Sequence, residues 1–470
     1  MAGEHDFKGK QVTVVGLGIE GVDLVRFLHA QGARITVSDA KPAERLRPRL
    51  EQIANIPVRL SLGANDPQDL LAADAVFLSQ SVRLDLAGLA EVRQRGTPIS
   101  SMFKLFLELC PGPVAGITGS SGKTTTTALV GEMFRCDGRP HLVGGNIGVA
   151  MLSHLATLTP DTWVVLEVSH TQLQLLPERS PNVACLLNIT PNHLDRFSWD
   201  EYRRLKADIL RCQKSGDHAV LGYDDSETRA LAKQAPAEVL YFSLASDIPG
   251  DGAFLRDGWV VSRRRGREKR LFPIESLRLP GRHNWANAVA AAAVASVCGL
   301  SPQAIARAAA EFQGLPHRLE FVHQIGGVAY YNDSIATTPE RTLAALRSFS
   351  QPLLLLLGGR EKHLPLEKLA EEACRRCRAV IFFGESAPVL EEALQRAADR
   401  RPADDRPRLT RVTRLAEAVE TARSLAQAGD VVILSPACTS YDAYDNFEQR
   451  GADFRRLILR LAQEVEPSPR

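Results

Sequence analysis

The sequence predicts an α/β protein of three domains, each built around a largely parallel β-sheet. With 470 residues, the chain is too long for one ordinary hydrophobic core. Short apolar runs alternate with segments of helical periodicity almost throughout, which is typical of parallel strands joined by crossover helices. Proline and glycine gather near residues 110–113 and 314–318. We therefore expect domains over residues 1–112, 113–315 and 316–470.

The N-terminal segment opens with a βαβ unit. Its strands are predicted in QVTVVGLG and ARITVSD, with a helix from about Gly21 between them, and further strands follow in VRLSL and AVFLS. Gly16, Gly18 and Gly21 occupy the first turn, and Asp39 ends the second strand. Such a turn lets the backbone approach a phosphate at a helix N-terminus. The pattern predicts a Rossmann-like domain that binds a nucleotide. NAD, with Asp39 on a ribose, is one candidate, and a tight turn without a ligand is the alternative.

The central segment combines buried strands with a glycine-rich loop. Strand VAGIT precedes the loop, and a helix is expected from Thr124 to about Cys136. Further strands are predicted in TWVVLEV, VACLLNI and HAVLGY, followed by a polar hairpin over 255–273. After Gly281 comes HNWANAVAAAAVASVCG, whose alanines suit a tightly packed helix.

The C-terminal segment repeats the alternation of strands and helices. Strands are expected in GVAYYND, PLLLLLGG, AVIFFG and DVVILSP, with helical segments between them. This pattern predicts a second Rossmann-like domain.

The charge balance argues against nucleic acid and membrane surfaces as partners. Lys and Arg total 57 and Asp and Glu total 55, so no overall field attracts either of them. The N-terminus, MAGEHDFKGKQ, lacks the apolar run of a signal peptide, and LLLLL at 353–357 is too short to span a bilayer. We expect a cytoplasmic protein without membrane insertion, and a monomer.

The loop TGSSGKTTTT at 118–127 carries the strongest chemical prediction. In such loops backbone N–H groups surround phosphate oxygens, a lysine neutralises the β- and γ-phosphates, and a hydroxyl binds magnesium. Lys123 and Thr124 supply these groups, although Ile117 stands where the strict pattern has glycine. We expect a central P-loop domain that binds and spends ATP.

Two loops after buried strands offer metal ligands. Glu167 ends TWVVLEV, and His193 and Asp195 follow VACLLNI. The carboxyl edge of a parallel sheet is where ligands bind, and carboxylate and imidazole both bind metal ions. A solvated glutamate and a structural hydrogen bond of the histidine are the alternatives.

Polar clusters also mark the predicted domain boundaries, where clefts form. HNWAN contains Asn284 and Asn287, PHRLE contains Arg318, and Asp333 ends a strand. Each residue alone would suit a cap or a turn, but together they favour a nucleotide site.

In their order along the chain, these motifs resemble those of the Mur ligase family of peptidoglycan synthesis, and specifically its MurD type. The resemblance spans nearly the whole chain. It is carried by TGSSGKTTTT, GGNIG, NITPNHLDR, GRHNWANA, GLPHRLEFV, NDSIAT and SPACTSYDAYDNFEQRG. It implies an ATP-dependent ligase that adds D-glutamate to UDP-N-acetylmuramoyl-L-alanine through an acyl phosphate.

The resemblance also implies roles for individual residues. A lysine matching Lys206 is carbamylated in this family, and two Mg²⁺ ions are expected. Catalysis would involve Lys123, His193 and Lys206. Metal ligands would be Thr124, Glu167, His193 and Lys206. ATP would contact Gly119, Ser120, Ser121, Gly122, Lys123, Thr124, Thr125, Asn284, Asn287, Arg318 and Asp333. The UDP substrate would contact Leu17, Gly18, Asp39, Asn146, Ser169 and Gln172. The amino acid would contact Thr337, Lys362, Ser440 and Phe447.

Two departures leave alternatives open. His170 and Thr171 replace residues that are usual in the family, and Ile335 replaces a lysine that contacts the incoming glutamate. Arg360 or His363 could supply that charge instead. The loss of a cation leaves open L-glutamate or another amino acid as substrate. An NAD-dependent oxidoreductase and a non-catalytic nucleotide-binding protein are the alternatives of other classes.

Overall fold

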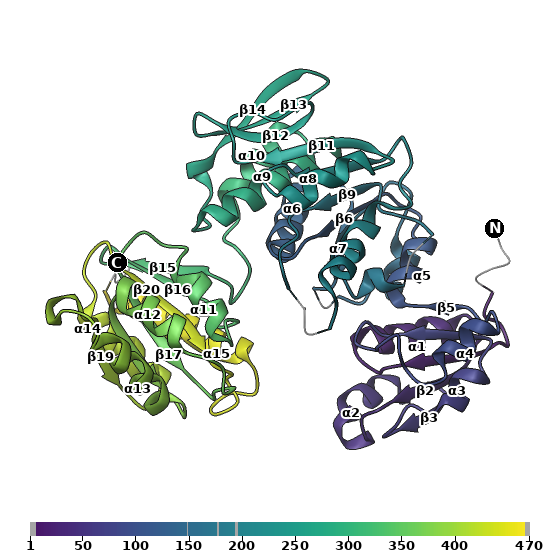
Figure 1. The fold of residues 1–470 in the computed structure, drawn as a ribbon, viewed down its shortest axis with the longest axis horizontal. Coiled ribbons are helices and arrows are strands. Elements are labelled where there is room, and N and C mark those ends of the chain that lie inside the picture. The colour runs from purple at the N-terminus through teal and green to yellow at the C-terminus, as the bar shows by residue number, and fades with distance from the viewer. Residues whose placement is uncertain (1–5, 148, 176–177, 193–195, 466–470) are drawn as a thin grey trace. The chain divides into compact units, whose positions relative to one another are not determined.

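The computed structural model describes residues 6–147, 149–175, 178–192 and 196–465 and contains three β-sheets (Figure 1). One sheet falls within each of the three predicted segments. By compactness the chain forms two units, Met1–Ile274 with Ala286–Ala309 and Glu275–Trp285 with Ala310–Arg470, so the first two sheets share a unit. The boundaries near 112 and 315 therefore remain predictions.

The N-terminal sheet is fully parallel, in the order β3-β2-β1-β4-β5. All four strands predicted here are present. Glycine is required in its first turn, because Gly16 has φ +90° and a Cβ on Gly21 would lie 2.1 Å from the Gly16 carbonyl oxygen. The elements are β1 (Gln11–Val15), α1 (Ile19–Ala30), β2 (Arg34–Asp39), α2 (Ala43–Leu50), β3 (Val58–Leu62), α3 (Pro67–Leu71), β4 (Ala75–Leu78), α4 (Leu89–Gln94), β5 (Ile99–Ser100) and α5 (Met102–Leu109).

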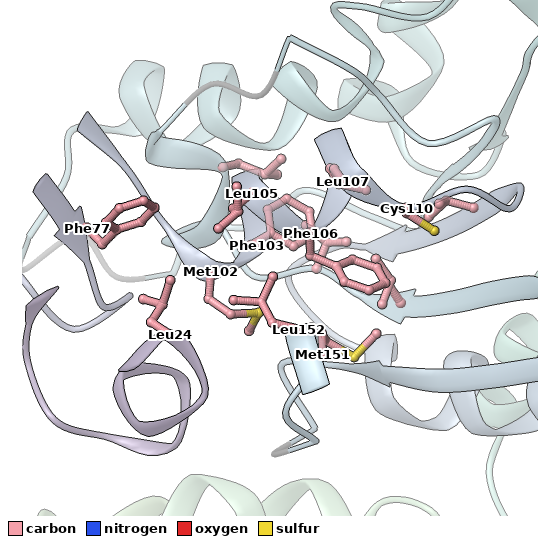
Figure 2. Packing of buried hydrophobic residues seen from close by; sticks show 14 of the residues in the cluster. Leu24, Phe77, Met102, Phe103, Leu105, Phe106, Leu107, Cys110, Met151 and Leu152 are labelled. Atoms are coloured by element: carbon pink, nitrogen blue, oxygen red, sulfur yellow. The ribbon is translucent and has the colours of Figure 1, made fainter. Parts of the chain in front are cut away.

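Helix α5 joins the cores of the first two sheets (Figure 2). Its apolar side chains pack with Leu24 and Phe77 of the first sheet layer and with Met151 and Leu152 of the central segment. The carboxylate of Asp23 on α1 accepts hydrogen bonds from the backbone N–H groups of Leu152 and Ser153, at 2.7 and 3.1 Å. A continuous apolar core and a buried carboxylate therefore hold these two layers together.

The central sheet has nine strands in the order β14-β13-β12-β11-β10-β9-β6-β8-β7. Strands β6 to β12 pair in parallel, and β12, β13 and β14 pair antiparallel. The elements are β6 (Val114–Thr118), α6 (Lys123–Asp137), β7 (His141–Gly145), β8 (Trp163–Glu167), β9 (Val183–Leu186), α7 (Trp199–Ala207), β10 (His218–Gly222), α8 (Ser226–Ala230), β11 (Glu238–Ser243), β12 (Gly252–Arg256), β13 (Trp259–Arg264), β14 (Arg267–Pro273), α9 (Arg282–Val297) and α10 (Pro302–Glu311).

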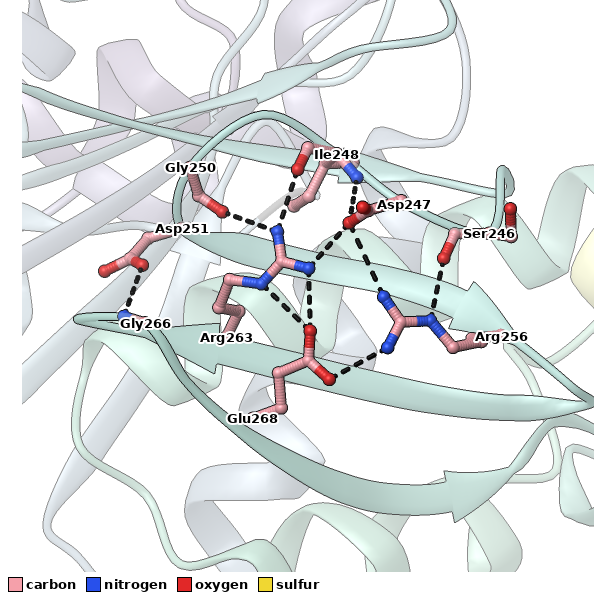
Figure 3. A network of polar contacts seen from close by, with 9 residues as sticks. All are labelled: Ser246, Asp247, Ile248, Gly250, Asp251, Arg256, Arg263, Gly266 and Glu268. Atoms are coloured by element: carbon pink, nitrogen blue, oxygen red, sulfur yellow. Dashed lines mark hydrogen bonds and ion pairs between the residues drawn. The ribbon is translucent and has the colours of Figure 1, made fainter.

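The predicted polar hairpin over 255–273 is confirmed, and a charge network crosses it (Figure 3). Arg263 forms ion pairs with Asp247 at 2.6 Å and with Glu268 at 2.7 Å. Arg256 pairs with the same Glu268 at 2.9 Å. Both guanidinium groups lie over the ring of Phe254, so the end of the sheet is stabilised by cation–π contacts as well as ion pairs.

The C-terminal sheet has the order β15-β16-β20-β17-β18-β19 and is parallel except for β15. Its β17 is buried on both faces, as LLLLL predicts: Leu353, Leu355 and Leu357 pack with α11, α12 and α13, and Leu354 and Leu356 pack with α14 and α15. The elements are β15 (Glu320–Ile325), β16 (Val328–Asn332), α11 (Pro339–Leu346), β17 (Leu353–Gly358), α12 (Glu367–Arg376), β18 (Cys377–Phe383), α13 (Ala387–Ala398), β19 (Arg408–Arg411), α14 (Leu415–Leu425), β20 (Val431–Ala437) and α15 (Phe447–Val465).

Candidate functional site

The predicted phosphate loop lies between β6 and α6, at the carboxyl edge of the central sheet. Gly119 and Gly122 have φ of +153° and +84°, which disfavour any residue with a Cβ. A Cβ on Gly122 would also lie 2.3 Å from Oδ1 of Asn287 on α9. The loop ends at the N-terminus of the 15-residue helix α6, where backbone N–H groups favour an anion.

The loop is held from the segment that follows β9. The backbone N–H of Ser120 donates to the Asn188 carbonyl at 2.9 Å, and the N–H of Ser121 donates to Asn188 Oδ1 at 3.0 Å. The Ser120 hydroxyl also bonds to the Tyr202 hydroxyl on α7, at 3.0 Å. The groups that fix the loop are thus uncharged, and Lys123 supplies positive charge beside it.

Lys123 begins α6 and folds back over the loop. Its Nζ donates to the carbonyl oxygens of Gly119 at 2.9 Å and Ser120 at 3.2 Å. Thr124 is half-buried and Thr125 is buried in the first turn of the same helix. An ammonium group and hydroxyls therefore gather where the sequence predicts the terminal phosphates.

Glu167, at the end of β8, brings a carboxylate to the neighbouring strand end. Its side chain is 3% exposed, and Oε1 accepts a hydrogen bond from Asn146 Nδ2 at 2.8 Å. Within the described part of the chain, Oε2 is buried without a hydrogen-bond partner. A buried carboxylate oxygen of this kind is costly unless a cation compensates it, so the predicted metal-ligand role fits this environment.

Lys206 on α7 is fully buried beside these groups. Its Nζ donates to Thr118 Oγ1 at 3.0 Å, and its exposed fraction is 1%. Burial lowers the pKa of this amine well below its ordinary value; Lys123 lowers it further, and Glu167 opposes the shift. The structure therefore brings Lys123, Glu167 and Lys206 together. His193 and Asp195 lie outside the described residues.

Asp39, the predicted substrate contact at the end of β2, accepts hydrogen bonds from two backbone N–H groups. Its Oδ2 accepts a hydrogen bond from the Leu17 N–H at 2.7 Å, and its Oδ1 accepts one from the Lys41 N–H at 2.9 Å. The carboxylate is 8% exposed. Asp39 therefore fixes the turn that contains Leu17 and Gly18.

A polar chain links Ser169 and Gln172, after β8, to the first turn of α1. Gln172 Oε1 accepts a hydrogen bond from the Ser169 N–H at 3.0 Å, and Gln172 Nε2 donates to Glu20 Oε1 at 3.0 Å. Glu20 also accepts a hydrogen bond from the Gln80 N–H, at 3.2 Å. Burial raises the pKa of Glu20. The sequence interpretation missed Glu20 and Gln80, for which no motif signals a role.

The second unit holds the remaining predicted nucleotide contacts. Asn284 is buried, and its Nδ2 donates to the Pro280 carbonyl at 2.7 Å. Asp333 follows β16 and accepts hydrogen bonds from the Ser435 hydroxyl at 2.8 Å and the Leu319 N–H at 3.2 Å. Burial raises the pKa of Asp333 to about 7, and nearby Arg318 opposes the shift.

The four predicted amino-acid contacts follow strand ends of the C-terminal sheet. Lys362 Nζ donates to Thr337 Oγ1 at 3.4 Å, Ser440 is buried, and Phe447 begins α15. Of the two groups considered as replacements for the cation at Ile335, Arg360 forms an ion pair with Glu385 at 2.9 Å. His363 is 88% exposed. Its Nδ1 lies 3.5 Å from the Glu361 carboxylate, so each of the two groups already has a carboxylate neighbour within the protein.

The comparisons with known proteins cover the whole fold. The model of the Mur ligase MurD-like N-terminal domain matches residues 10–101, that of the Mur ligase middle domain 117–295, and that of the Mur ligase glutamate ligase domain 317–438. UDP-N-acetylmuramoylalanine--D-glutamate ligase of Symbiobacterium thermophilum is 40% identical over 455 residues, covering 96% of this chain and 98% of that protein. The protein of the same name from Koribacter versatilis is 35% identical over 460 residues, covering 98% of this chain and 99% of the relative.

The chain belongs to the Mur ligase family.

Solved structures of other Mur ligases share the fold at low sequence identity. MurC of Thermotoga maritima, described as UDP-N-acetylmuramate-alanine ligase, gives a TM-score of 0.57 at 17% identity, covering 96% of this chain and 100% of that one. MurF of Acinetobacter baumannii gives 0.56 at 19% identity, covering 96% and 92%. The predicted three-domain α/β fold is thus confirmed.

In this Mur ligase, two expectations about the fold need adjustment. Strands β5, β7, β11, β12 and β19 were not predicted, and β15 adds an antiparallel edge to a sheet expected to be parallel. No helix in the described part of the chain has the length and apolar character needed to cross a bilayer.

Proposed function

We propose that this Mur ligase joins D-glutamate to UDP-N-acetylmuramoyl-L-alanine in peptidoglycan synthesis, at the expense of ATP. This proposal rests on the full-length similarity of the chain to relatives named UDP-N-acetylmuramoylalanine--D-glutamate ligase, at 34–40% identity. ATP use follows from membership in the family. The enzyme is therefore an acid–amino-acid ligase.

The chemistry requires two anions to meet. The carboxylate of the alanyl group attacks the γ-phosphorus of ATP, which gives an acyl phosphate and ADP. The glutamate amine then attacks the acyl carbon, loses a proton, and displaces phosphate as the amide forms. Two unit charges of like sign at about 4 Å repel by roughly 4 kcal/mol at an intermediate dielectric. Lys123 and the N–H groups at the start of α6 supply opposing positive charge.

The buried Glu167 Oε2, which has no hydrogen-bond partner among the residues that the structure describes, fits a bound cation. Thr124 and Glu167 would hold one Mg²⁺, and His193 and Lys206 would hold a second. When bound there, Mg²⁺ would neutralise charge on the terminal phosphates. A bare ammonium at Lys206 would repel Mg²⁺, whereas a carbamate would offer an anionic oxygen. Burial favours the neutral amine, the form that adds CO₂.

The other predicted residues divide among the three substrates. For ATP we propose the loop Gly119–Thr125 with Asn284, Asn287, Arg318 and Asp333. The UDP substrate would contact Leu17, Gly18, Asp39, Asn146, Ser169 and Gln172, and Asp39 also fixes the turn that contains Leu17. Thr337, Lys362, Ser440 and Phe447 would receive the amino acid. We further propose a cytoplasmic monomer that binds neither nucleic acid nor membrane; light scattering of the purified protein tests its oligomeric state.

A panel of amino acids tests the proposal most directly. Purified protein would receive ATP, Mg²⁺ and UDP-N-acetylmuramoyl-L-alanine with D-glutamate, L-glutamate, L-lysine or diaminopimelate. We expect phosphate release and a new amide, identified by mass spectrometry, when D-glutamate is supplied, and neither product with the other three amino acids. Turnover with another amino acid would support the alternative that Ile335 leaves open.

The two remaining alternatives give distinct results. A non-catalytic nucleotide-binding protein would bind ATP yet release no phosphate with any amino acid. An oxidoreductase would bind NAD in a calorimetric titration, where we expect no binding.

A further inference from the structure

Arg450 is the largest fully buried side chain among the described residues, with an exposed fraction of 0%. It lies on α15, three residues after Phe447. Within the described part of the chain, no carboxylate forms an ion pair with it. A buried cation is costly unless hydrogen bonds compensate it, so the acceptors of this guanidinium need an explanation.

All five N–H groups of Arg450 donate to oxygen atoms at the ends of three strands. Nε donates to Ser334 Oγ at 3.0 Å, and Nη2 donates to the carbonyl oxygens of Ser334 at 3.0 Å and Cys438 at 3.1 Å. Nη1 donates to the carbonyl oxygens of Thr439 at 3.1 Å and Gly358 at 3.4 Å. These acceptors lie at the last residue of β17 and in the loops that follow β16 and β20, so one planar group connects three strand ends and the loops that leave them.

The surrounding backbone is shaped for this approach. A Cβ on Gly359 would lie 2.9 Å from Arg450 Nη1 and 2.1 Å from the Thr439 carbonyl oxygen. The loops after β17 and β20 also pair directly, through hydrogen bonds of 2.9 Å in both directions between the backbones of Arg360 and Thr439. The Ser334 hydroxyl, which accepts from Arg450, donates onward to the Phe447 carbonyl at 2.8 Å.

The same three loops carry the proposed amino-acid contacts. Thr337 lies three residues after Ser334, Lys362 four residues after Gly358, and Ser440 directly after Thr439. Thr337 and Lys362 meet at 3.4 Å. A change in the relative placement of the loops therefore moves these side chains apart.

We propose that Arg450 is the positioning residue of the amino-acid pocket, holding in register the three loops that carry Thr337, Lys362 and Ser440. The inference rests on the proposed function, because it concerns the substrate that those loops receive. Asp333 has its own contacts with Ser435 and Leu319. ATP binding should therefore depend less on Arg450 than amino-acid binding does.

Arg450→Lys tests this, because lysine keeps the charge but has three donors on a point rather than five in a fork. We expect the KM for D-glutamate to rise about tenfold or more, since small misplacements of substrate contacts have effects of this size. The KM values for ATP and the UDP substrate should stay within about twofold. The matched control is Arg376→Lys: Arg376 also donates to a backbone carbonyl, that of Phe349 at 2.8 Å, but lies at the opposite end of α12 from the pocket loops. It should leave all three KM values unchanged.

Amide hydrogen exchange of the protein without substrates gives a second readout that does not depend on the reaction. In Arg450→Lys, peptides covering 334–338, 358–362 and 438–441 should all exchange faster than in wild type and in Arg376→Lys. Unchanged exchange, or an equal rise in all three KM values, would overturn the inference. If wild-type protein forms no amide, the proposed function fails, while the exchange data still report on the loops.

Ser334→Ala covers the case in which Arg450→Lys does not fold. It removes the hydroxyl between Arg450 and Phe447 and should raise the KM for D-glutamate in the same direction by a smaller factor. An unchanged KM for D-glutamate in a folded Ser334→Ala protein would then contradict the proposal.

Discussion

Two turns in this molecule share a strand–glycine–helix geometry but differ in charge. The first, at Gly16 to Gly21, is closed by the carboxylate of Asp39, which accepts hydrogen bonds from two backbone N–H groups. The second, at Gly119 to Gly122, is held by the neutral amide of Asn188 and covered by Lys123. Glycine spacing therefore determines the shape of such a turn, whereas the charged groups around it determine how strongly the terminal phosphates of ATP are favoured there.

Removing the cation from the second turn should have the largest effect. In Lys123→Ala the carboxylate and the γ-phosphate would meet without the lysine charge, and we expect ligation to fall by about 10³-fold or more. Turnover is followed by phosphate release and the fold by circular dichroism. Lys214→Ala, an exposed lysine of the same domain, is the matched control and should behave as wild type. Near-normal turnover in Lys123→Ala would remove the phosphate-loop assignment.

Lys206→Ala should have the second-largest effect, because it removes a buried amine beside the second turn. We expect turnover to fall by about 10²-fold or more, with partial recovery in millimolar acetate or formate, since either ion can restore an anionic oxygen. Sodium chloride at equal ionic strength serves as the control and should not restore turnover. A fully active variant would contradict a role at the metal site.

Gly122→Ala tests the comparison from the other side, because it changes the shape of the second turn and leaves the charged groups around that turn in place. The new Cβ would lie 2.3 Å from Asn287 Oδ1 at a φ of +84°, so we expect the KM for ATP to rise and stability to fall by about 1–2 kcal/mol. Gly138→Ala, at the other end of α6, has φ +74° and no atom within 4 Å of the new Cβ. It should lose stability through backbone strain alone, with no change in the KM for ATP. Equal kinetic effects in the two variants would argue against a special role for the loop.

Asp39→Asn should have the smallest effect. The amide keeps one acceptor oxygen for two N–H donors, so we expect a loss of about 1 kcal/mol in unfolding free energy and a KM for the UDP substrate raised a few-fold. Asp74→Asn is the control, because Asp74 accepts the Gln11 N–H at 2.8 Å at the opposite edge of the same sheet. It should lose similar stability without a change in KM, as read from chemical denaturation and initial rates.

Local pattern predicted most of the strands and the position of α6. VAGIT and LLLLL are apolar on both faces, and their burial needs no knowledge of distant residues. Among the strands that were missed, β7 and β15 have the sequences HLVGG and EFVHQI, which are largely half-buried or exposed and carry glycine or polar residues. At the rim of a sheet, neighbouring strands decide whether such a segment pairs.

Roles that depend on distant partners were the hardest to predict. Lys123 and Gly122 follow from spacing within one loop. The bond between Gln172 and Glu20 joins residues 152 positions apart, and the bonds of Arg450 to Ser334 span 116 positions. No local pattern contains such pairs. For Asp39 the position at a strand end was predicted, but its acceptance of two backbone N–H groups depends on the conformation of the turn.

The hairpin that ends the central sheet has a consequence for how neighbouring molecules meet in concentrated solution. Strand β14 is the last strand on its side, and an unpaired edge invites strand addition from another copy. Four successive residues of β14, Arg267 to Arg270, are exposed and all carry charge. The hydration of these side chains and their net positive charge oppose pairing with a second copy, so we expect this rim to disfavour aggregation.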